Sequence, residues 1–397
     1  MILYHMSNEE INLNIFLSQR LIRLNLIYHL KIFFIKIRTF WNTVITLLFS
    51  CLIFSCSLND NSYNDIKIIR NITSDIDTLT IWNKSCEYVI QKSDFSVKDT
   101  LLIESGTIIK FNPDSSCSIT ISDNGAIIAQ GSTSEHIIFT SLFDEKHNLA
   151  NVSQKYTKSP NTGNWKFVFV NNHKNSFFDF CDFYYGGGGD QKSTIKIGTE
   201  SSASITNCIF AYNDGGDLQS GNGVIDASQS SSETAIRSNT FFSNNLPLIV
   251  NTSYSMEGSN IFHNPLQISE INKYNCILVK SPSTINTSIV WAEDEVPYVI
   301  YGPNFDISPN ASLVFGNNVV LKIMKNTVMK IEGSNSTLLN YDGPGVIFTS
   351  IFDDTHKGDT NGDGNLTSPK NGDWNMSVAD NSTFEWTNIL YALQVAK

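Results

Sequence analysis

The residues with the clearest chemical pattern lie near the end of the chain, where the sequence reads Gly358-Asp-Thr-Asn-Gly-Asp-Gly364. Asp359, Asn361 and Asp363 alternate along this segment as oxygen ligands, and the final glycine permits a tight turn. This spacing matches the first half of an EF-hand-like calcium loop. The segment therefore predicts calcium as its ligand, and a metal-free loop of Asx turns is the alternative.

The segment lacks the bidentate glutamate that closes such a loop, because Lys370 occupies that position. A calcium ion would need a further carboxylate from nearby in the chain. Asp353, Asp354 and Asp373 lie within reach along the sequence. We expect one or more of them to complete the site.

The surrounding sequence is an internal duplication. Phe139-Thr-Ser-Leu-Phe-Asp144 is repeated as Phe348-Thr-Ser-Ile-Phe-Asp353, and Ile109-Lys-Phe111 corresponds to Leu321-Lys-Ile323. The offset stays between 209 and 212 residues, so the match is a repeat rather than chance composition. We name residues 81–165 copy 1 and residues 290–374 copy 2. Tryptophans recur at equivalent points of the two copies, which indicates structural positions: Trp82, Trp165, Trp291 and Trp374.

The composition favours short strands joined by turns. Charged residues make up 16% of the 397 residues, below the roughly 25% of an ordinary soluble domain, and aromatic residues make up 11%. A helical bundle is excluded because its surfaces need more Ala, Glu and Lys than this chain supplies. After residue 56 there are 22 basic and 36 acidic residues, and the only arginines are Arg70 and Arg237. Nucleic acid is therefore not expected as a partner.

The first 56 residues are predicted to be an N-terminal extension and a leader. Basic residues from Lys31 to Arg38 precede an apolar run at 43–55, which is short for a membrane span and typical of a secretory signal. Residues 1–30 precede this basic region, and we interpret them as an extension that results from a translation start assigned too far upstream. Residues 57–78 are polar and are predicted to be a tether.

The apolar run ends in Leu52-Ile-Phe-Ser-Cys56, which resembles a bacterial lipobox. Cys56 is therefore the predicted lipidation site, and Cys51 is a second candidate. An ordinary signal peptide or an uncleaved membrane anchor is the alternative.

A shorter period runs through the middle of the chain. Asn207-x-x-Phe210-x-x-Asn213 recurs as Asn239-x-x-Phe242-x-x-Asn245, and a contracted form follows as Asn260-Ile-Phe-His-Asn264. Coils of roughly 20 to 30 residues with an inward aromatic are what a β-solenoid requires. A β-sandwich rich in Asn loops is the alternative.

The cysteines and histidines do not form a recognisable metal or catalytic motif. The five cysteines after the leader are an odd, widely spaced set without a CxxC pair, and Cys181 and Cys208 are expected to stack in the core. The histidines are scattered and show no paired ligand spacing: His136, His147, His173, His263 and His356.

Four segments together resemble a known family: Gly106-Thr-Ile-Ile-Lys-Phe111, Gly125-Ala-Ile-Ile-Ala-Gln-Gly131, His136-Ile-Ile-Phe-Thr-Ser141 and Gly163-Asn-Trp165. Their order is similar to that in bacterial right-handed parallel β-helix surface proteins of the pectin-lyase-like superfamily. The predicted fold is therefore an all-β, right-handed parallel β-helix with an internal duplication. Its expected blocks are 79–285 and 286–397, and the second is expected to be incomplete or poorly covered at its C-terminal end.

The same resemblance implies a polysaccharide lyase as a competing hypothesis. In such an enzyme, acidic residues hold calcium against a uronate, and Lys or Arg acts as the base. The candidates for such a catalytic cluster are Asp214, Asp217, Asp226 and Arg237. Acidic residues in Gly-rich loops also serve as turn formers, which is the alternative for this group.

We expect an exported, lipid-anchored surface protein that binds or adheres, with polysaccharide as the partner implied by the family resemblance. The outer membrane or cell surface is the expected location, and a secreted or periplasmic protein is the alternative. A calcium-dependent polysaccharide lyase or hydrolase and a purely structural stalk are the competing hypotheses for function.

Overall fold

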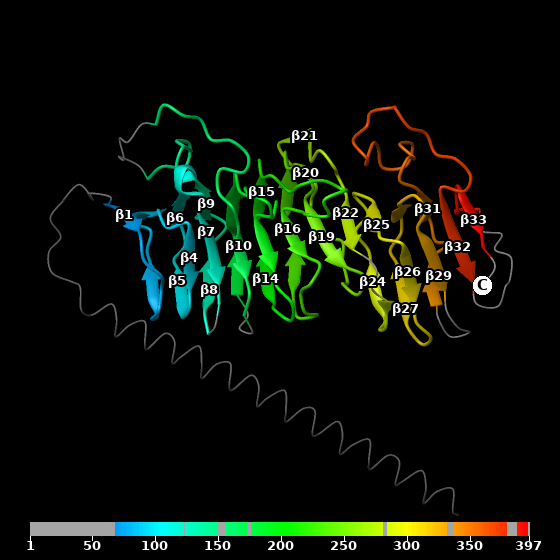
Figure 1. Cartoon of the computed structure of the whole chain (residues 1–397), viewed down its shortest axis with the longest axis horizontal. Coiled ribbons are helices and arrows are strands. Elements are labelled where there is room, and N and C mark those ends of the chain that lie inside the picture. The colour runs from blue at the N-terminus through cyan, green and yellow to red at the C-terminus, as the bar shows by residue number, and fades with distance from the viewer. Residues whose placement is uncertain are drawn as a thin grey trace, which may run out of the picture. The chain divides into compact units, whose positions relative to one another are not determined.

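The computed structural model describes residues 68–122, 124–149, 156–172, 176–280, 284–331, 337–378 and 387–395. Cys51, Cys56 and the rest of the predicted leader lie outside these ranges. Within them the regular structure is short strands, and the one helical element described is the 3-10 turn η1 (Pro113–Ser115). The strands wind into a right-handed parallel β-helix, so the fold predicted from composition and repeats is confirmed (Figure 1).

Sheet A contains seven parallel strands from the first part of the β-helix. In spatial order they are β1 (Ile68–Ile72), β3 (Cys86–Ile90), β6 (Ile108–Phe111), β9 (Ile137–Ser141), β12 (Cys181–Tyr184), β15 (Ile209–Ala211) and β18 (Thr240–Phe242).

Sheet B contains ten parallel strands and runs through both copies. In spatial order they are β4 (Asp94–Val97), β7 (Ser118–Ile121), β10 (Val168–Val170), β13 (Ile195–Ile197), β16 (Ile225–Ala227), β19 (Leu248–Asn251), β22 (Ile277–Lys280), β25 (Tyr298–Tyr301), β28 (Val320–Ile323) and β31 (Ile347–Ser350).

Sheet C completes the coils of the first part. Its strands are β2 (Thr80–Trp82), β5 (Thr100–Ile103), β8 (Ala126–Gln130), β11 (Ser176–Asp179), β14 (Ala203–Thr206) and β17 (Ala235–Arg237).

Two further parallel sheets complete the coils of copy 2, and one antiparallel hairpin stands apart. Sheet D contains β23 (Thr284–Ile285), β26 (Asn304–Ile307), β29 (Val328–Ile331), β32 (Trp374–Val378) and β33 (Ala392–Gln394). Sheet E contains β24 (Ile289–Trp291), β27 (Ser312–Phe315) and β30 (Thr337–Leu339). The hairpin pairs β20 (His263–Asn264) with β21 (Gln267–Ile271).

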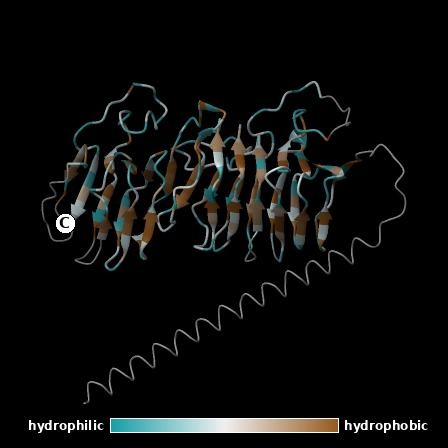
Figure 2. Cartoon of the chain, turned by 180° about the vertical axis from the view of Figure 1, so that it is seen from behind, coloured by the Kyte–Doolittle hydropathy of each residue, from teal (hydrophilic) through white to brown (hydrophobic). Residues whose placement is uncertain are grey.

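Alternate residues of each strand point into the coils, and these residues are mostly apolar, whereas the connecting loops are hydrophilic (Figure 2). A column of phenylalanine rings follows sheet A, with neighbouring ring centres 4.7 to 5.4 Å apart. It consists of Phe139, Phe183, Phe210, Phe241 and Phe262. Burial of one such ring contributes about 1.5–3 kcal/mol, so the column is a principal source of stability.

The sequence motif placed Phe242 in this column, and that prediction is wrong by one residue. In the structure Phe210 pairs with Phe241, while Phe242 is only partly buried and lies edge-on to Tyr212. Because successive side chains of a strand face opposite sides, a shift of one residue exchanges the buried and exposed positions.

Stacked asparagines stabilise the corner between sheets A and B. The Asn213 main-chain N–H donates to the side-chain oxygen of Asn244 at 3.0 Å, and the Asn244 N–H donates to Asn272 at 3.3 Å. Their side-chain amides donate to main-chain carbonyls of neighbouring coils. The Asn period was thus a correct indication of coil stacking, although the ladder uses Asn244 where the motif indicated Asn245.

The two predicted stacked cysteines are also in register. Cys181 and Cys208 occupy neighbouring positions on successive coils, since Asp182 pairs with Ile209, and both thiols are free and fully buried. Burial raises the pKa of the Cys181 thiol, and its contact with Cys208 raises it further. They behave as small core residues.

The duplication is visible in equivalent contacts at the start of each copy. Trp82 stacks on Tyr88 with ring centres 4.6 Å apart, and Trp291 stacks on Tyr298 at 4.9 Å. Each tyrosine hydroxyl then accepts a main-chain N–H five residues upstream, from Asn83 at 2.9 Å and from Glu293 at 3.0 Å.

Equivalent strands nevertheless belong to different sheets in the two copies. In copy 1 the strands β3, β6 and β9 lie in sheet A, whereas their equivalents β25, β28 and β31 lie in sheet B. Likewise β4, β7 and β10 lie in sheet B, and β26, β29 and β32 lie in sheet D. Copy 2 therefore continues the β-helix, but each of these strands lies one sheet further around the coil than its equivalent in copy 1.

Candidate functional site

Each copy inserts a long loop at the same point of its third coil. Loop 1 (142–167, described at 142–149 and 156–167) connects β9 to β10, and loop 2 (351–373) connects β31 to β32. The two views show both loops on the same side of the β-helix, with the β20–β21 hairpin between them (Figures 1 and 2). This side of the β-helix therefore carries three projections.

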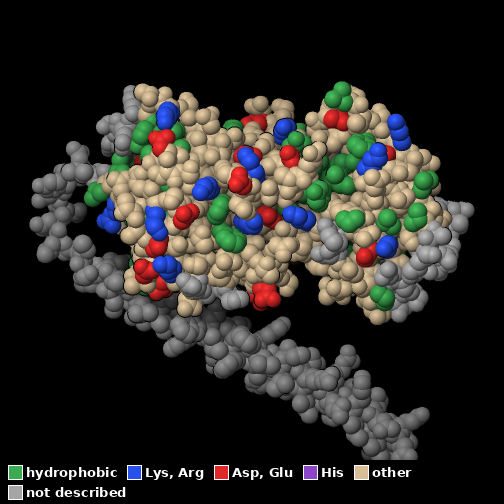
Figure 3. Space-filling model, in the orientation of Figure 1, with side chains coloured by type: hydrophobic (Ala, Val, Ile, Leu, Met, Phe, Trp, Pro, Cys, Tyr) green, Lys and Arg blue, Asp and Glu red, His purple; other side chains and the backbone are tan. Residues whose placement is uncertain are grey.

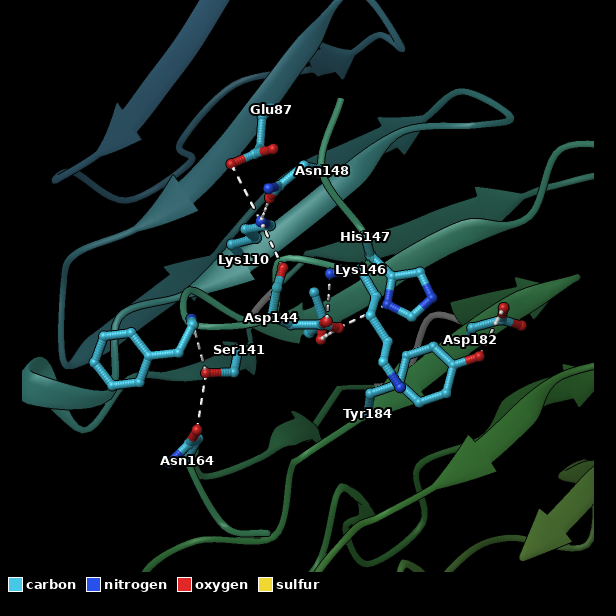
Figure 4. A network of polar contacts seen from close by, with 12 residues as sticks. Glu87, Lys110, Ser141, Asp144, Lys146, His147, Asn148, Asn164, Asp182 and Tyr184 are labelled. Atoms are coloured by element: carbon cyan, nitrogen blue, oxygen red, sulfur yellow. Dashed lines mark hydrogen bonds and ion pairs between the residues drawn. The ribbon is translucent and has the colours of Figure 1, made fainter. Parts of the chain in front are cut away.

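A buried lysine anchors loop 1 (Figure 4). Lys110 is 1% exposed, and its ammonium donates to the main-chain oxygen of Asp144 at 3.0 Å and to the side-chain oxygen of Asn148. The Glu87 carboxylate lies 3.6 Å from the same nitrogen. Burial lowers the pKa of Lys110, although the neighbouring carboxylates of Glu87, Asp144 and Glu145 oppose this shift.

The Asp144 carboxylate fixes the first turn of loop 1. It accepts a hydrogen bond from the Thr140 hydroxyl at 2.7 Å and contacts His147 Nδ1 at 2.6 Å. Burial alone would raise the pKa of Asp144, but these contacts and the Lys146 N–H bond leave it lowered. The His147 ring stacks on Tyr184 with ring centres 4.7 Å apart (Figure 4). The turn is therefore held rigidly on the β-helix.

Loop 2 repeats this anchor with different partners. Lys322 is fully buried, and its ammonium donates to the Gly358 main-chain oxygen at 2.6 Å and to the Thr360 hydroxyl at 2.7 Å. Burial lowers the pKa of Lys322 to about 8. Asp353 repeats the role of Asp144, since it contacts Thr349 and His356, both at 2.6 Å.

These lysines and histidines were not among the site residues predicted from the sequence. The signal was present, because each copy carries Lys at the same strand position and Asp-x-x-His after its third strand: Lys110 with Asp144-x-x-His147, and Lys322 with Asp353-x-x-His356. The sequence showed five scattered histidines, and the structure describes four of them. Each of the four contacts a carboxylate: His136, His147, His263 and His356. His173 lies outside the described residues.

Loop 2 brings three acidic residues together. Carboxylate oxygens of Asp354, Asp359 and Asp363 all lie within 4.8 Å of one another. Calcium binds oxygens at about 2.3–2.6 Å, so oxygens up to about 5 Å apart can share one ion. Burial raises the pKa of Asp354, and the charges of Asp359 and Asp363 raise it further. Its Oδ1 atom is buried and has no hydrogen-bond partner among the described residues. The donor set therefore fits a hard divalent cation.

The other candidate ligands have structural partners. Asp353 is fully buried in the anchor of loop 2, and Asp373 accepts hydrogen bonds from the Ser350 hydroxyl at 2.7 Å and the Lys370 N–H at 2.9 Å. The Asn361 side chain donates to Asp363. Of the three carboxylates proposed to complete the calcium loop, the structure thus brings Asp354 to the cluster.

Two hollows flank this cluster. One of about 380 Å³ is lined by the partly buried rings of Tyr274 and Phe352 together with Asp217, Lys325 and Asn361, and we name it the groove. The other lies beside the β20–β21 hairpin and includes Asp359 in its wall. Loop 2 contributes a polar side chain to each hollow, Asn361 to the groove and Asp359 to the other.

Tyr274 and loop 2 are in direct contact. Gly362 has a positive φ of 73°, and a Cβ atom at this position would lie 2.8 Å from the Tyr274 ring. The Lys273 ammonium lies over the Tyr274 ring, 5.0 Å from its centre. The position of the groove's aromatic ring thus depends on the backbone of the acidic loop.

The four candidates for a catalytic cluster are not brought together. Asp214 pairs with Lys192, Asp217 accepts the N–H groups of Gln219 and Ser220, and Asp226 is buried on β16 and accepts from Ser228. Arg237 lies on β17 of sheet C and pairs with Glu257 at 3.3 Å. Each has a local structural partner.

The described surface carries both signs of charge. On the face in Figure 3, acidic and basic side chains are interspersed and hydrophobic side chains lie in several patches. Among the residues that the structure describes, we find no helix with the length and apolar character needed to cross a membrane. Comparison with family models, with curated proteins and with solved structures finds no match for this chain.

Proposed function

We propose that this chain is an exported, lipid-anchored surface protein whose groove binds polysaccharide. The observation that carries the proposal is the composition of the groove, in which the rings of Tyr274 and Phe352 lie beside Asp217, Lys325 and Asn361. Sugar rings stack on aromatic faces through their C–H groups, and their hydroxyls need charged or amide partners at the edge. Export, anchoring through Cys56 and membership of the pectin-lyase-like superfamily remain inferences from the sequence.

Calcium is part of this proposal. Asp354, Asp359 and Asp363 would hold the ion, and it would neutralise their mutual repulsion and fix loop 2. Because Gly362 packs against Tyr274, a fixed loop would also fix the aromatic wall of the groove.

The test is a glycan-array binding assay on the purified protein, with calcium and with chelator, in which the same wells are read for unsaturated sugar products. We expect saturable binding without product. Tyr274→Ala should weaken the affinity for the glycan about tenfold, which corresponds to about 1.4 kcal/mol of binding free energy. Tyr156→Ala is the matched control, because Tyr156 lines the corresponding hollow beside loop 1.

The outcomes separate the competing functions. Product formation would favour a polysaccharide lyase, and the absence of saturable binding to any glycan would favour a structural stalk. Binding that Tyr274→Ala leaves unchanged would place the glycan elsewhere. For the anchor, metabolic labelling with a radioactive fatty acid should mark the wild type and leave Cys56→Ser unmarked.

A further inference from the structure

Two buried side chains and one partly buried amide in copy 1 have the arrangement of an amide-forming centre. The Lys110 nitrogen contacts the side-chain oxygen of Asn148, and it lies 3.6 Å from Glu87 Oε1. The second oxygen of Glu87 accepts the Leu149 N–H at 3.4 Å, directly after Asn148. Glu87 therefore reaches both the amine and the segment that carries the amide (Figure 4).

The surroundings exclude water from Glu87 and Lys110. Glu87 is 3% exposed and Lys110 is 1% exposed. A small apolar cluster of Val89, Leu142 and Phe143 packs beside them, and Tyr156 covers that cluster. Desolvation favours the uncharged amine, which is the nucleophilic form of lysine.

We propose that Lys110 and Asn148 become joined by an intramolecular isopeptide bond, with Glu87 as the group that transfers the protons. The bond would tie β6 covalently to loop 1.

The chemistry balances without a cofactor or an oxidant. A proton passes from the Lys110 ammonium to the Glu87 carboxylate, which leaves a neutral amine and a carboxylic acid. The amine nitrogen attacks Asn148 Cγ, and Glu87 moves a proton from that nitrogen to the departing amide nitrogen. The Cγ–Nδ2 bond breaks, ammonia leaves, and it carries away the proton that Glu87 first received.

Copy 2 lacks the parts for the same reaction. Pro297 occupies the position of Glu87, and Lys357 occupies that of Asn148. Lys322 instead meets a main-chain carbonyl and a hydroxyl. Copy 2 is therefore an internal control in which a buried lysine stays unmodified.

The test is peptide mapping of the folded full chain by trypsin and mass spectrometry. Unlinked protein gives the separate peptides 99–110 and 147–155, because trypsin cleaves after lysine. A linked Lys110 resists cleavage, so residues 99–146 should be found joined to 147–155 with a mass lower by one ammonia, about 17 Da. Glu87→Gln and Lys110→Arg should restore the separate peptides, and Lys322→Arg should keep the joined one.

Circular dichroism and thermal unfolding will show that each variant is folded. If Glu87→Gln does not fold, Asn148→Ala serves in its place, because Asn148 is only partly buried. The proposal is overturned if the folded wild type gives only the separate peptides, with Asn148 intact or deamidated to aspartate. A joined peptide that persists in folded Glu87→Gln would overturn the role of Glu87.

Discussion

Loops 1 and 2 begin with nearly the same sequence, and equivalent tryptophans lie near the end of loop 1 and directly after loop 2, at Trp165 and Trp374. The two loops nevertheless put different chemistry around an equivalent buried lysine. In copy 1, Lys110 is surrounded by a carboxylate and an amide, Glu87 and Asn148. In copy 2, the Lys322 ammonium donates hydrogen bonds to two neutral oxygens, and the acidic residues Asp354, Asp359 and Asp363 form a cluster of their own. Duplication thus preserved the anchor of the loop and left its remaining residues free to acquire separate roles.

The tryptophan that ends each copy should show the largest difference. Trp165 stacks on Phe111 with ring centres 4.2 Å apart, whereas the position equivalent to Phe111 in copy 2 is Ile323. Both tryptophans are fully buried. We expect Trp165→Ala to lower the free energy of unfolding by about 4–5 kcal/mol and Trp374→Ala by about 3 kcal/mol. Urea unfolding of both variants measures the two losses of unfolding free energy. Equal losses would contradict the inference that the tryptophan of copy 1 is better packed.

Calcium should stabilise the chain through copy 2. At a calcium concentration of 100 times Kd, the free energy of unfolding should rise by about 2.7 kcal/mol. Asp354→Asn should abolish this gain. Glu145→Gln is its matched control, since Glu145 occupies the equivalent position in copy 1. Thermal unfolding with calcium and with chelator measures this gain. If Asp354→Asn is stabilised by calcium as much as the wild type, the ion does not bind at loop 2.

The corner before β25 should give copy 2 a pH dependence that copy 1 lacks. Asn239 donates to Asn260, and Asn260 donates to Glu293 at 3.2 Å, so a ladder of amides ends in a carboxylate. Burial raises the pKa of Glu293 from 4.5 to about 7. Copy 1 has Asn83 at the equivalent position.

Because the folded state binds the Glu293 proton more tightly than the unfolded state, the contribution of Glu293 to stability is largest below pH 4.5 and falls as the pH rises through 7. Glu293→Gln should remove this fall and raise the free energy of unfolding at pH 8 by roughly 1–3 kcal/mol. Urea titrations at pH 5 and pH 8 provide the measurement. An unchanged difference between the two pH values would show that Glu293 is not its source.

The smallest expected effect concerns the link between loop 2 and the groove. Gly362→Ala adds a Cβ against the Tyr274 ring and disfavours the positive φ, which should cost about 1 kcal/mol. Gly358→Ala is the control, because its Cβ would meet no atom within 4 Å although its φ is also positive. Glycan affinity should fall for Gly362→Ala alone, and an equal fall in both variants would point to backbone strain instead.

Much of the fold was predictable because it follows from local patterns. Short apolar segments bounded by Gly and Asn specify strands and turns, and a repeat specifies stacked coils. Register was not predictable in the same way. Phe241 and Phe242 are chemically identical neighbours, and the register of β18 against β15 decided which ring joined the column.

The candidate site was likewise predictable in its local spacing and not in its tertiary contacts. The sequence by itself determined that oxygen-bearing side chains alternate in loop 2, at Asp359, Asn361 and Asp363, because their spacing is a property of one short segment. Only the tertiary structure decided that Asp354 rather than Asp353 or Asp373 joins them, because burial and hydrogen bonds assign each carboxylate to its partner. The meeting of Glu87, Lys110 and Asn148 was equally beyond the sequence, since these residues come from two successive coils and a loop that only stacking brings together.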